Sequence, residues 1–312
     1  MKTPGPNIGS KGDNALDKAF RAEGVFWRGN LHGHSNNSDG ALHPEAVCKL
    51  YRDQGYDFIS VTDHFREVYG YPVTDTRAYR DEDFTTILGA ELHAPRTSRG
   101  EIWHILAVGL PLDFPPPDET EQGPELAQRA SDAGAYVAIA HPHWYQLQIE
   151  DGEALQVANA VEVYNHTSQV NADRGDGLVF YDAMLSRGHQ LHCIAVDDSH
   201  IKVDDTFGGW VMVKSEQNTP EAILAALKAG EFYSSQGPEI HQIAFEDDHV
   251  VIRCSPAETV MLLGPVSKNV RVHGRNLTSA KLAFKDFVNE WCRAVVVDKS
   301  GRRAWSNPHW FG

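Results

Sequence analysis

Short apolar runs alternate along this chain with segments of helical spacing, and most of the runs lead into a histidine, an aspartate or a glutamate. We expect strands over 25–34, 57–64, 85–93, 103–110, 136–140, 160–164 and 193–196. We expect helices between them, over 44–54, 124–133 and 174–187. This alternation predicts a parallel sheet, and about seven strands suit a closed or nearly closed barrel whose strand ends converge on one mouth.

The pattern changes after Gly208. We expect one more strand at 210–213 and an amphipathic helix at 220–229. Short alternating segments then predict the antiparallel strands of a small sandwich, at 249–253, 260–263, 270–273 and 294–298. The sequence therefore predicts an α/β fold with an N-terminal arm over residues 1–24, a barrel domain over 25–237 and a small β-sandwich domain over 238–312.

The composition excludes several classes of protein. The chain has 43 acidic and 28 basic residues and a formal net charge of −15, whereas a long nucleic-acid groove needs clustered positive charge. Its 4 cysteines show no paired short spacing, so the sequence indicates neither a zinc ribbon nor a disulfide framework and favours reduced thiols. No segment approaches the roughly 18 apolar residues of a membrane span. We expect a soluble cytoplasmic protein that binds a small molecule, and the sequence leaves its oligomeric state open.

The polar residues at the predicted strand ends are candidate metal ligands. His32 and His34 are two residues apart, so on a strand they face the same side and can bind one metal ion together. The full set of candidates is His32, His34, Asp39, His64, Glu91, His104, His141, Asp198 and His200. Imidazoles and carboxylates without thiolates suit zinc, manganese or iron, and a set of this size suits two or three divalent ions with Glu91 as a bridge.

Some of these residues also have simpler interpretations. His104 taken alone fits an ordinary buried histidine, and Asp39 could cap the following helix or hold a turn. Asp63 could orient a histidine instead of binding a metal ion. We expect three further residues near the same strand ends to contact substrate or to support the ligands, namely His143, Glu162 and His166.

The order of these residues resembles the polymerase and histidinol phosphatase (PHP) superfamily. Its motifs stand here as His32-Gly33-His34, Ser38-Asp39-Gly40, Thr62-Asp63-His64, Gly89-Ala90-Glu91, His104, His141-Pro142 and Asp198-Ser199-His200. Residues 232–238 and 303–308 are similar to the branch of carbaryl-hydrolase-type metallohydrolases, in which a small β-domain follows the barrel. One departure is Asp197, which stands where many relatives have serine. The resemblance implies a distorted (β/α)7 barrel.

The resemblance also implies a trinuclear metal site. His32, His34, Glu91 and Asp198 would hold the first metal ion, Glu91, His104 and His141 the second, and Asp39, His64 and His200 the third. The implied activity is that of a metal-dependent phosphoesterase that hydrolyses a small phosphorylated metabolite or nucleotide through a metal-bridging hydroxide. Glu91, Asp198 and His200 are then the candidate catalytic residues, and Asp198 or His200 would pass a proton to the leaving oxygen.

An anionic substrate needs positively charged contacts, and arginine binds two phosphate oxygens at once. The candidate substrate contacts are Arg66, Arg96, Arg99, His143 and Lys202. Two other functions remain open. The same hydroxide could attack carbon in a carbamate, amide or carboxyl ester, as in the carbaryl-hydrolase type, or the chain could hold metal ions as an accessory protein without hydrolysing anything.

Overall fold

One mixed sheet of six strands contains most of the strands expected to form the barrel. In spatial order it consists of β3 (His64–Phe65), β5 (Gly89–Leu92), β6 (Ile105–Val108), β7 (Tyr136–Ile139), β8 (Ala160–Asn165) and β9 (His192–Val196). β6 pairs antiparallel with both β5 and β7, whereas the other pairs are parallel. The predicted parallel arrangement is therefore wrong at β6. The chain reverses there because residues 93–104 join β5 to β6 without a crossover helix.

A second, larger sheet contains the remaining strands. Its spatial order is β12 (Ile240–Glu246), β13 (His249–Leu263), β15 (Trp291–Val297), β16 (Arg303–Ser306), β11 (Phe232–Ser235), β10 (Trp210–Ser215), β1 (Val25–Asn30), β2 (Phe58–Ile59) and β4 (Thr85–Thr86). In addition, β14 (Asn269–Ala283) pairs with β13 and β17 (His309–Trp310) pairs with β15. The strand pairs within the described residues do not close into a ring, so the predicted barrel is not confirmed.

The structure describes residues 16–311, so most of the predicted N-terminal arm lies outside the described residues. The helices are α1 (Lys18–Arg21), α2 (Pro44–Asp53), α3 (Gly123–Asp132), α4 (Ile149–Ala154), α5 (His166–Ala172), α6 (Leu178–Ser186) and α7 (Pro220–Ala229). Short 3-10 turns occupy Glu67–Tyr69, Arg77–Tyr79 and Lys285–Phe287. Within the described part of the chain, no helix is long and apolar enough to cross a membrane.

Local sequence signals explain the ends of the best-predicted helix. In α7, the Thr219 side chain accepts a hydrogen bond from the backbone N–H of Ala222, and Pro220 occupies the first turn, where no N–H is needed. Gly230 ends the helix in the left-handed conformation with φ 74°, which glycine adopts without steric cost. The structure therefore confirms the expected range 220–229.

The two sheets meet along β9 and β11. The hydroxyl of Ser234 on β11 donates to the Cys193 carbonyl at 2.8 Å and accepts from the Ala195 N–H at 3.2 Å, and both partners lie on β9. Beyond the end of β1, Gly33 forms an isolated parallel bridge with Ser199. The ends of β1 and β9 are therefore adjacent although they belong to different sheets.

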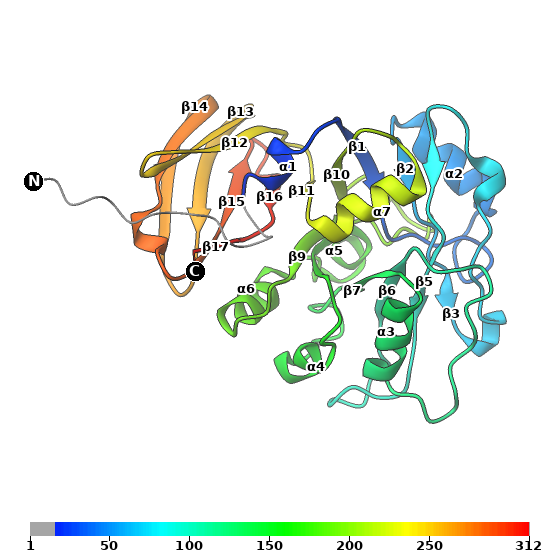
Figure 1. Cartoon of the computed structure of the whole chain (residues 1–312). Coiled ribbons are helices and arrows are strands. Elements are labelled where there is room, and N and C mark those ends of the chain that lie inside the picture. The colour runs from blue at the N-terminus through cyan, green and yellow to red at the C-terminus, as the bar shows by residue number, and fades with distance from the viewer. Residues whose placement is uncertain (1–15, 312) are drawn as a thin grey trace, which may run out of the picture.

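The C-terminal strands continue the large sheet. β16 pairs antiparallel with β11, and the two segments expected at 249–253 and 260–263 form one strand, β13. Arg293 on β15 is 2% exposed and donates to both carboxylate oxygens of Asp182 on α6, each at 2.9 Å. Figure 1 shows β12 to β17 at one end of the molecule and α2, β2 and β3 at the other. The C-terminal strands are antiparallel as expected, and their arrangement as a sandwich stays a prediction.

Candidate metal centre

His32 and His34 lie just beyond β1, held against the segment that follows β9. The His34 N–H donates to the Ser199 carbonyl at 2.8 Å, and the Asp198 N–H donates to the His32 carbonyl at 2.9 Å. These bonds place Asp198 Oδ1 3.2 Å from His32 Nε2 and 2.8 Å from His34 Nε2. The first predicted ligand group is therefore brought together by backbone pairing between segments that are distant in the sequence.

Glu91 on β5 is fully buried and lies at the centre of the cluster. Its Oε1 is 2.7 Å from His104 Nδ1 and 3.1 Å from His141 Nε2, while its Oε2 is 2.5 Å from His64 Nδ1 and 3.7 Å from His32 Nε2. One carboxylate thus contacts histidines of different groups. This is the position that the sequence predicts for a bridging carboxylate.

Asp39 is the carboxylate of the third predicted group. Its Oδ1 is 3.4 Å from His64 Nε2 and 3.3 Å from His200 Nε2. Its Oδ2 lies 3.4 Å from the ammonium of Lys202. His34 also lies close enough to share a metal ion with these three residues. The structure therefore brings all nine candidate ligands into one continuous cluster.

The cluster fits divalent cations. Several buried polar atoms of its residues make no hydrogen bond within the described residues, among them His32 Nε2, His34 Nδ1, Asp39 Oδ1, Glu91 Oε2 and His141 Nδ1. Burying carboxylate and imidazole atoms without hydrogen bonds is costly, and a bound cation lowers that cost. The donor set of nitrogen and oxygen atoms is one that zinc, manganese and iron all accept.

The charges within the cluster shift its pKa values. Burial alone would raise the pKa of Glu91, but His64 and His104 hold it well below its usual range. Burial likewise opposes the ionised form of Asp198, yet His32 and His34 lower its pKa. Burial tends to lower the pKa of His200, but the Asp39 carboxylate 3.3 Å from its ring and the charge of Asp198 raise it to about 9. The carboxylates therefore remain ionised at neutral pH and available as ligands.

Two candidate ligands adopt a backbone conformation that residues with side chains rarely take. Asp198 has φ 57° and His141 has φ 23°, both in the left-handed region. Strain of this kind persists only where the surrounding structure imposes it, and it concentrates at functional sites. In Asp198, the flanking hydrogen bonds of Ser199 and His32 impose it.

Glu162 on β8 supports the cluster from behind. Its carboxylate accepts hydrogen bonds from His32 Nδ1 at 2.6 Å, from the His141 N–H at 2.7 Å and from Asn165 Nδ2 at 2.9 Å. The bond to Nδ1 fixes the His32 ring so that Nε2 faces Asp198 and Glu91. Such a carboxylate–histidine pair is the usual partner of a metal-binding imidazole.

The buried Asp63 holds one of the two loops that carry the ligands. Asp63 accepts hydrogen bonds from the Ser35 N–H and from the hydroxyls of Ser35, Ser38 and Thr74, and none of these partners is a histidine. It therefore shapes the loop between His34 and Asp39 and does not orient an imidazole.

Asp197, directly before the candidate ligand Asp198, fixes the other ligand loop. It accepts hydrogen bonds from the Tyr51 hydroxyl at 2.7 Å and from the N–H groups of Phe207, Gly208 and Gly209. These bonds tie the two ends of the loop at residues 198–208 together, and this loop carries Asp198 and His200.

The cluster lies in a pocket of about 610 Å³. Arg66 and Lys202, two predicted substrate contacts, line this pocket, and Trp144 and Tyr145 form an aromatic part of its wall. Arg96, Arg99 and His143 are not among the lining residues, so their role in substrate binding stays a prediction. His166 hydrogen-bonds with the Tyr164 hydroxyl at 2.9 Å and likewise does not line the pocket.

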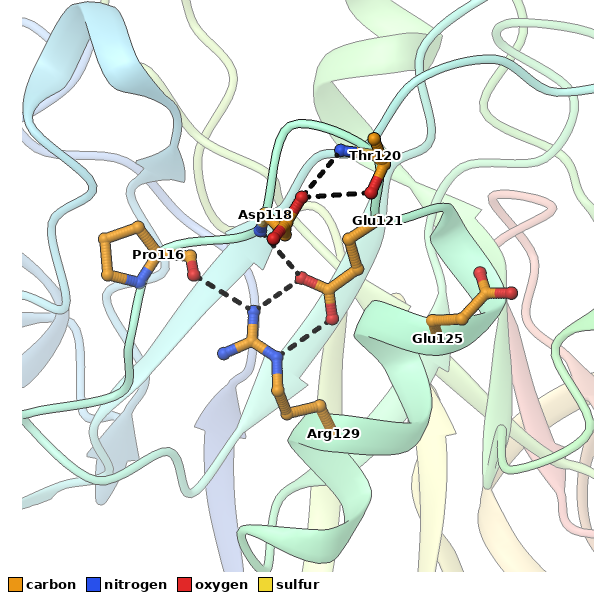
Figure 2. Close-up of a pocket in the computed structure, with 6 residues that line it drawn as sticks. All are labelled: Pro116, Asp118, Thr120, Glu121, Glu125 and Arg129. Atoms are coloured by element: carbon orange, nitrogen blue, oxygen red, sulfur yellow. Dashed lines mark hydrogen bonds and ion pairs between the residues drawn. The ribbon is translucent and has the colours of Figure 1, made fainter.

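Figure 2 shows a separate hollow whose charged groups pair with one another. Arg129 donates to both carboxylate oxygens of Glu121 at 2.9 and 2.8 Å, and Asp118 accepts from Thr120. Glu125 points away from Arg129 in this view. None of the candidate ligands lines this hollow, and it presents no group of converging ligand atoms.

His93 is a member of the cluster that the sequence analysis missed. It follows β5, and its Nε2 lies 2.9 Å from His64 Nδ1 and 3.5 Å from Glu91 Oε2. Glu91 and His93 have the same two-residue spacing as His32 and His34, so this spacing along a strand could have identified it.

The chain is similar to known proteins in sequence and in structure. No protein-family model matches the chain. An uncharacterized protein of Methanocaldococcus jannaschii is 22% identical over 206 residues, which is 63% of this chain and 84% of that protein. An amidohydrolase from Chromobacterium violaceum, with bound sulfate and no metal, matches at a TM-score of 0.45 and 14% identity, over 57% of this chain and 89% of that one.

The most extensive of these structural matches is a two-domain protein from Bacteroides vulgatus. It is described as containing a predicted PHP-like metal-dependent phosphoesterase, and it matches at a TM-score of 0.53 and 16% identity. The match covers 93% of this chain and 96% of that one, so it includes the C-terminal strands. A carbaryl-hydrolase-type C-terminal branch is not confirmed. The chain shares the overall fold of this two-domain, PHP-like protein.

Proposed function

We propose that the chain is a metal-dependent hydrolase of the PHP type, a phosphoesterase acting on a small phosphorylated metabolite or nucleotide. The observation that carries the proposal is the position of Glu91, which contacts His64, His104 and His141 on the floor of a pocket of about 610 Å³. The description of the Bacteroides vulgatus protein as a predicted phosphoesterase supports the same function.

Two or three divalent ions, of zinc, manganese or iron, would be held by the three predicted ligand groups. When bound, such ions supply a water of lowered pKa and stabilise the negative charge that develops on the substrate. The protein side chains do the rest. Glu162 and Asp197 keep His32 and Asp198 in place through the hydrogen bonds described above, so the ligands need little rearrangement during the reaction.

Arg66 and Lys202 are assigned to the free oxygens of an anionic substrate. Both are exposed side chains that line the pocket, and the Lys202 ammonium is 3.4 Å from Asp39 Oδ2. His200 or Asp198 would deliver a proton to the leaving oxygen.

An aromatic wall favours a second candidate, a carbamate, amide or carboxyl-ester hydrolase. The Trp144 side chain is 41% exposed, and its ring centroid lies 5.5 Å from that of His104 and 5.2 Å from that of His141. A flat apolar leaving group such as naphthol would stack there. The reacting atom would then be carbon.

An activity screen with metal-reconstituted protein separates these functions. The substrates are p-nitrophenyl phosphate, bis-p-nitrophenyl phosphate and a naphthyl carbamate, each tested with Mn²⁺, Zn²⁺ and Fe²⁺. We expect metal-dependent phosphate-ester hydrolysis, lost in E91Q and retained in E125Q, which makes the same chemical change at an exposed residue outside the cluster. Turnover of the carbamate alone would favour the second candidate. Full metal loading without hydrolysis of any ester would indicate an accessory protein.

A further inference from the structure

His93 has a fixed proton arrangement. Its Nδ1 lies 2.9 Å from the backbone carbonyl of Trp103, and a carbonyl can only accept a hydrogen bond, so Nδ1 carries a proton. The carbonyl is itself well placed, because the Trp103 N–H donates to Ala94 at 2.9 Å and the indole is 3% exposed. A neutral imidazole has one ring proton. His93 Nε2 therefore presents a lone pair.

That lone pair determines the proton arrangement of His64. His93 Nε2 lies 2.9 Å from His64 Nδ1, and a hydrogen bond between two nitrogens needs one proton between them. Since His93 Nε2 has none, His64 Nδ1 is the donor. The lone pair of neutral His64 is then at Nε2, on the side of the ring that faces Asp39 Oδ1 at 3.4 Å.

His200 has a matching arrangement on the other side of Asp39. Its Nδ1 lies 2.8 Å from the Asp198 backbone carbonyl, so this nitrogen is a donor and Nε2 is the lone pair of the neutral ring. His200 Nε2 lies 3.3 Å from Asp39 Oδ1, which makes no hydrogen bond. With both rings neutral, three acceptor atoms converge on one point, and a divalent cation that takes the place of the His200 proton makes this arrangement favourable.

Glu91 does not replace His93 in this role. Glu91 Oε2 is also close to His64 Nδ1, at 2.5 Å, but Glu91 is the candidate bridging ligand. An oxygen that binds a cation has less negative charge to offer a hydrogen bond. His93 Nε2 accepts no other hydrogen bond among the described contacts, and the side chain is only 5% exposed. Nε2 is therefore free to accept the hydrogen bond of His64 Nδ1.

We propose that His93 is a positioning residue: hydrogen bonds from His64 to His93 and from His93 to the Trp103 carbonyl hold His64 in the tautomer that directs Nε2 to a divalent cation bound with Asp39 and His200. This inference rests on the proposed metal-dependent function. It differs from direct metal binding by His93, in which Nε2 would itself be a ligand and His64 would need another acceptor.

Two substitutions test the role of the acceptor. H93Q retains a side-chain oxygen at about the position of Nε2, whereas H93L has a similar size and no acceptor. We expect H93L to bind one fewer metal ion per chain, or to bind it about 10- to 100-fold more weakly, and H93Q to stay close to wild type. Metal content is measured by inductively coupled plasma mass spectrometry, and affinity by titration calorimetry with Mn²⁺. The thermal midpoints of the metal-free proteins show whether each variant is folded.

The tautomer is observed directly by long-range ¹H–¹⁵N NMR of the Zn²⁺-loaded protein, where His64 is expected to carry its proton on Nδ1. Unchanged metal content and affinity in H93L would overturn the proposal, and so would a loss in H93Q as large as in H93L, because the latter indicates direct ligation. If H93L does not fold, H93N, whose side chain is too short to reach His64, takes its place. Wild-type protein that binds no divalent ion would instead contradict the proposed function itself.

Discussion

Asp198 Oδ1 lies 2.8 Å from His34 Nε2, although 164 residues separate the two in the sequence. The contact exists because Gly33 and Ser199 form a parallel bridge beyond the ends of β1 and β9. The metal cluster therefore forms only when these two distant segments are paired, and cations bound there should in turn stabilise the folded chain.

Neutralising Asp198 tests this coupling. We expect D198N to retain the fold and to weaken metal binding by at least about tenfold. The substitution removes the negative charge of a candidate ligand that contacts both His32 and His34. The rise in thermal midpoint that the wild-type chain shows on adding Mn²⁺ or Zn²⁺ should shrink accordingly. D204N, an exposed change in the same loop, is the control and should behave as wild type.

Removing Glu162 should loosen the first ligand group without removing a ligand. E162A deletes the acceptor of His32 Nδ1 and of the His141 N–H, so we expect metal affinity to fall about 10- to 100-fold. E162Q keeps an acceptor oxygen and should lie between E162A and wild type. Calorimetric titration with Zn²⁺ measures the difference, and equal affinities in all three proteins would contradict the supporting role.

Replacing Asp197 should destabilise the chain. Its carboxylate is fully buried and accepts from Tyr51 and from the N–H groups of Phe207, Gly208 and Gly209. D197A leaves these donors without a partner. We therefore expect the free energy of unfolding to fall by about 2–4 kcal/mol. Y51F removes one donor and should cost about 1 kcal/mol. Urea unfolding of the metal-free proteins gives both values, and a loss under about 1 kcal/mol in D197A would be too small for this role.

His192 should make the stability depend on pH. Burial and the positive charge of Lys18 lower its pKa from 6.5 to about 4, so the folded state keeps it neutral. Between pH 4 and 6.5 the unfolded chain therefore binds more protons at His192 than the folded chain does. The contribution of neutral His192 to the free energy of unfolding is fully present above pH 6.5 and is lost as the pH falls towards 4. Relative to H192Q, wild-type protein should lose up to about 3 kcal/mol across this window. Denaturant titrations at several pH values measure this loss. The control is H241Q, which makes the same change at an exposed histidine.

Metal binding should release protons. In the metal-free protein the pKa of His200 is about 9, because Asp39 and Asp198 outweigh the opposite effect of burial. At pH 7 a cation must therefore displace the proton, and affinity should rise with pH up to about 9. Calorimetry in two buffers of different ionisation enthalpy counts the released protons. Affinity that is independent of pH between 6 and 9 would show that His200 is not a ligand.

Much of the local structure follows from the sequence. The expected range of α7 agrees with signals that act within one or two helical turns: the Thr219 cap, Pro220 in the first turn and Gly230 at the end. The candidate ligands also follow from the sequence, since His-x-His and Asp-x-His spacings place side chains on one face of a strand end.

The partners and directions of the strands could not be predicted in the same way. β6 is an apolar run like its neighbours, and only the loop at 93–104 and the hydrogen bonds to β5 and β7 make it antiparallel. The C-terminal strands have the alternation of a small sandwich, yet β16 joins the large sheet through β11. Periodicity indicates which face of a strand is buried and says nothing about which strand lies beside it.

The sequence by itself therefore determined the donor set, imidazoles and carboxylates at strand ends, because ligand chemistry is a property of side-chain type. Only the tertiary structure decided how the set is arranged: Glu91 between several histidines, Glu162 behind His32, and His93 against His64. These contacts join segments that are far apart in the sequence, and their geometry depends on hydrogen bonds that form only when the sheets are assembled.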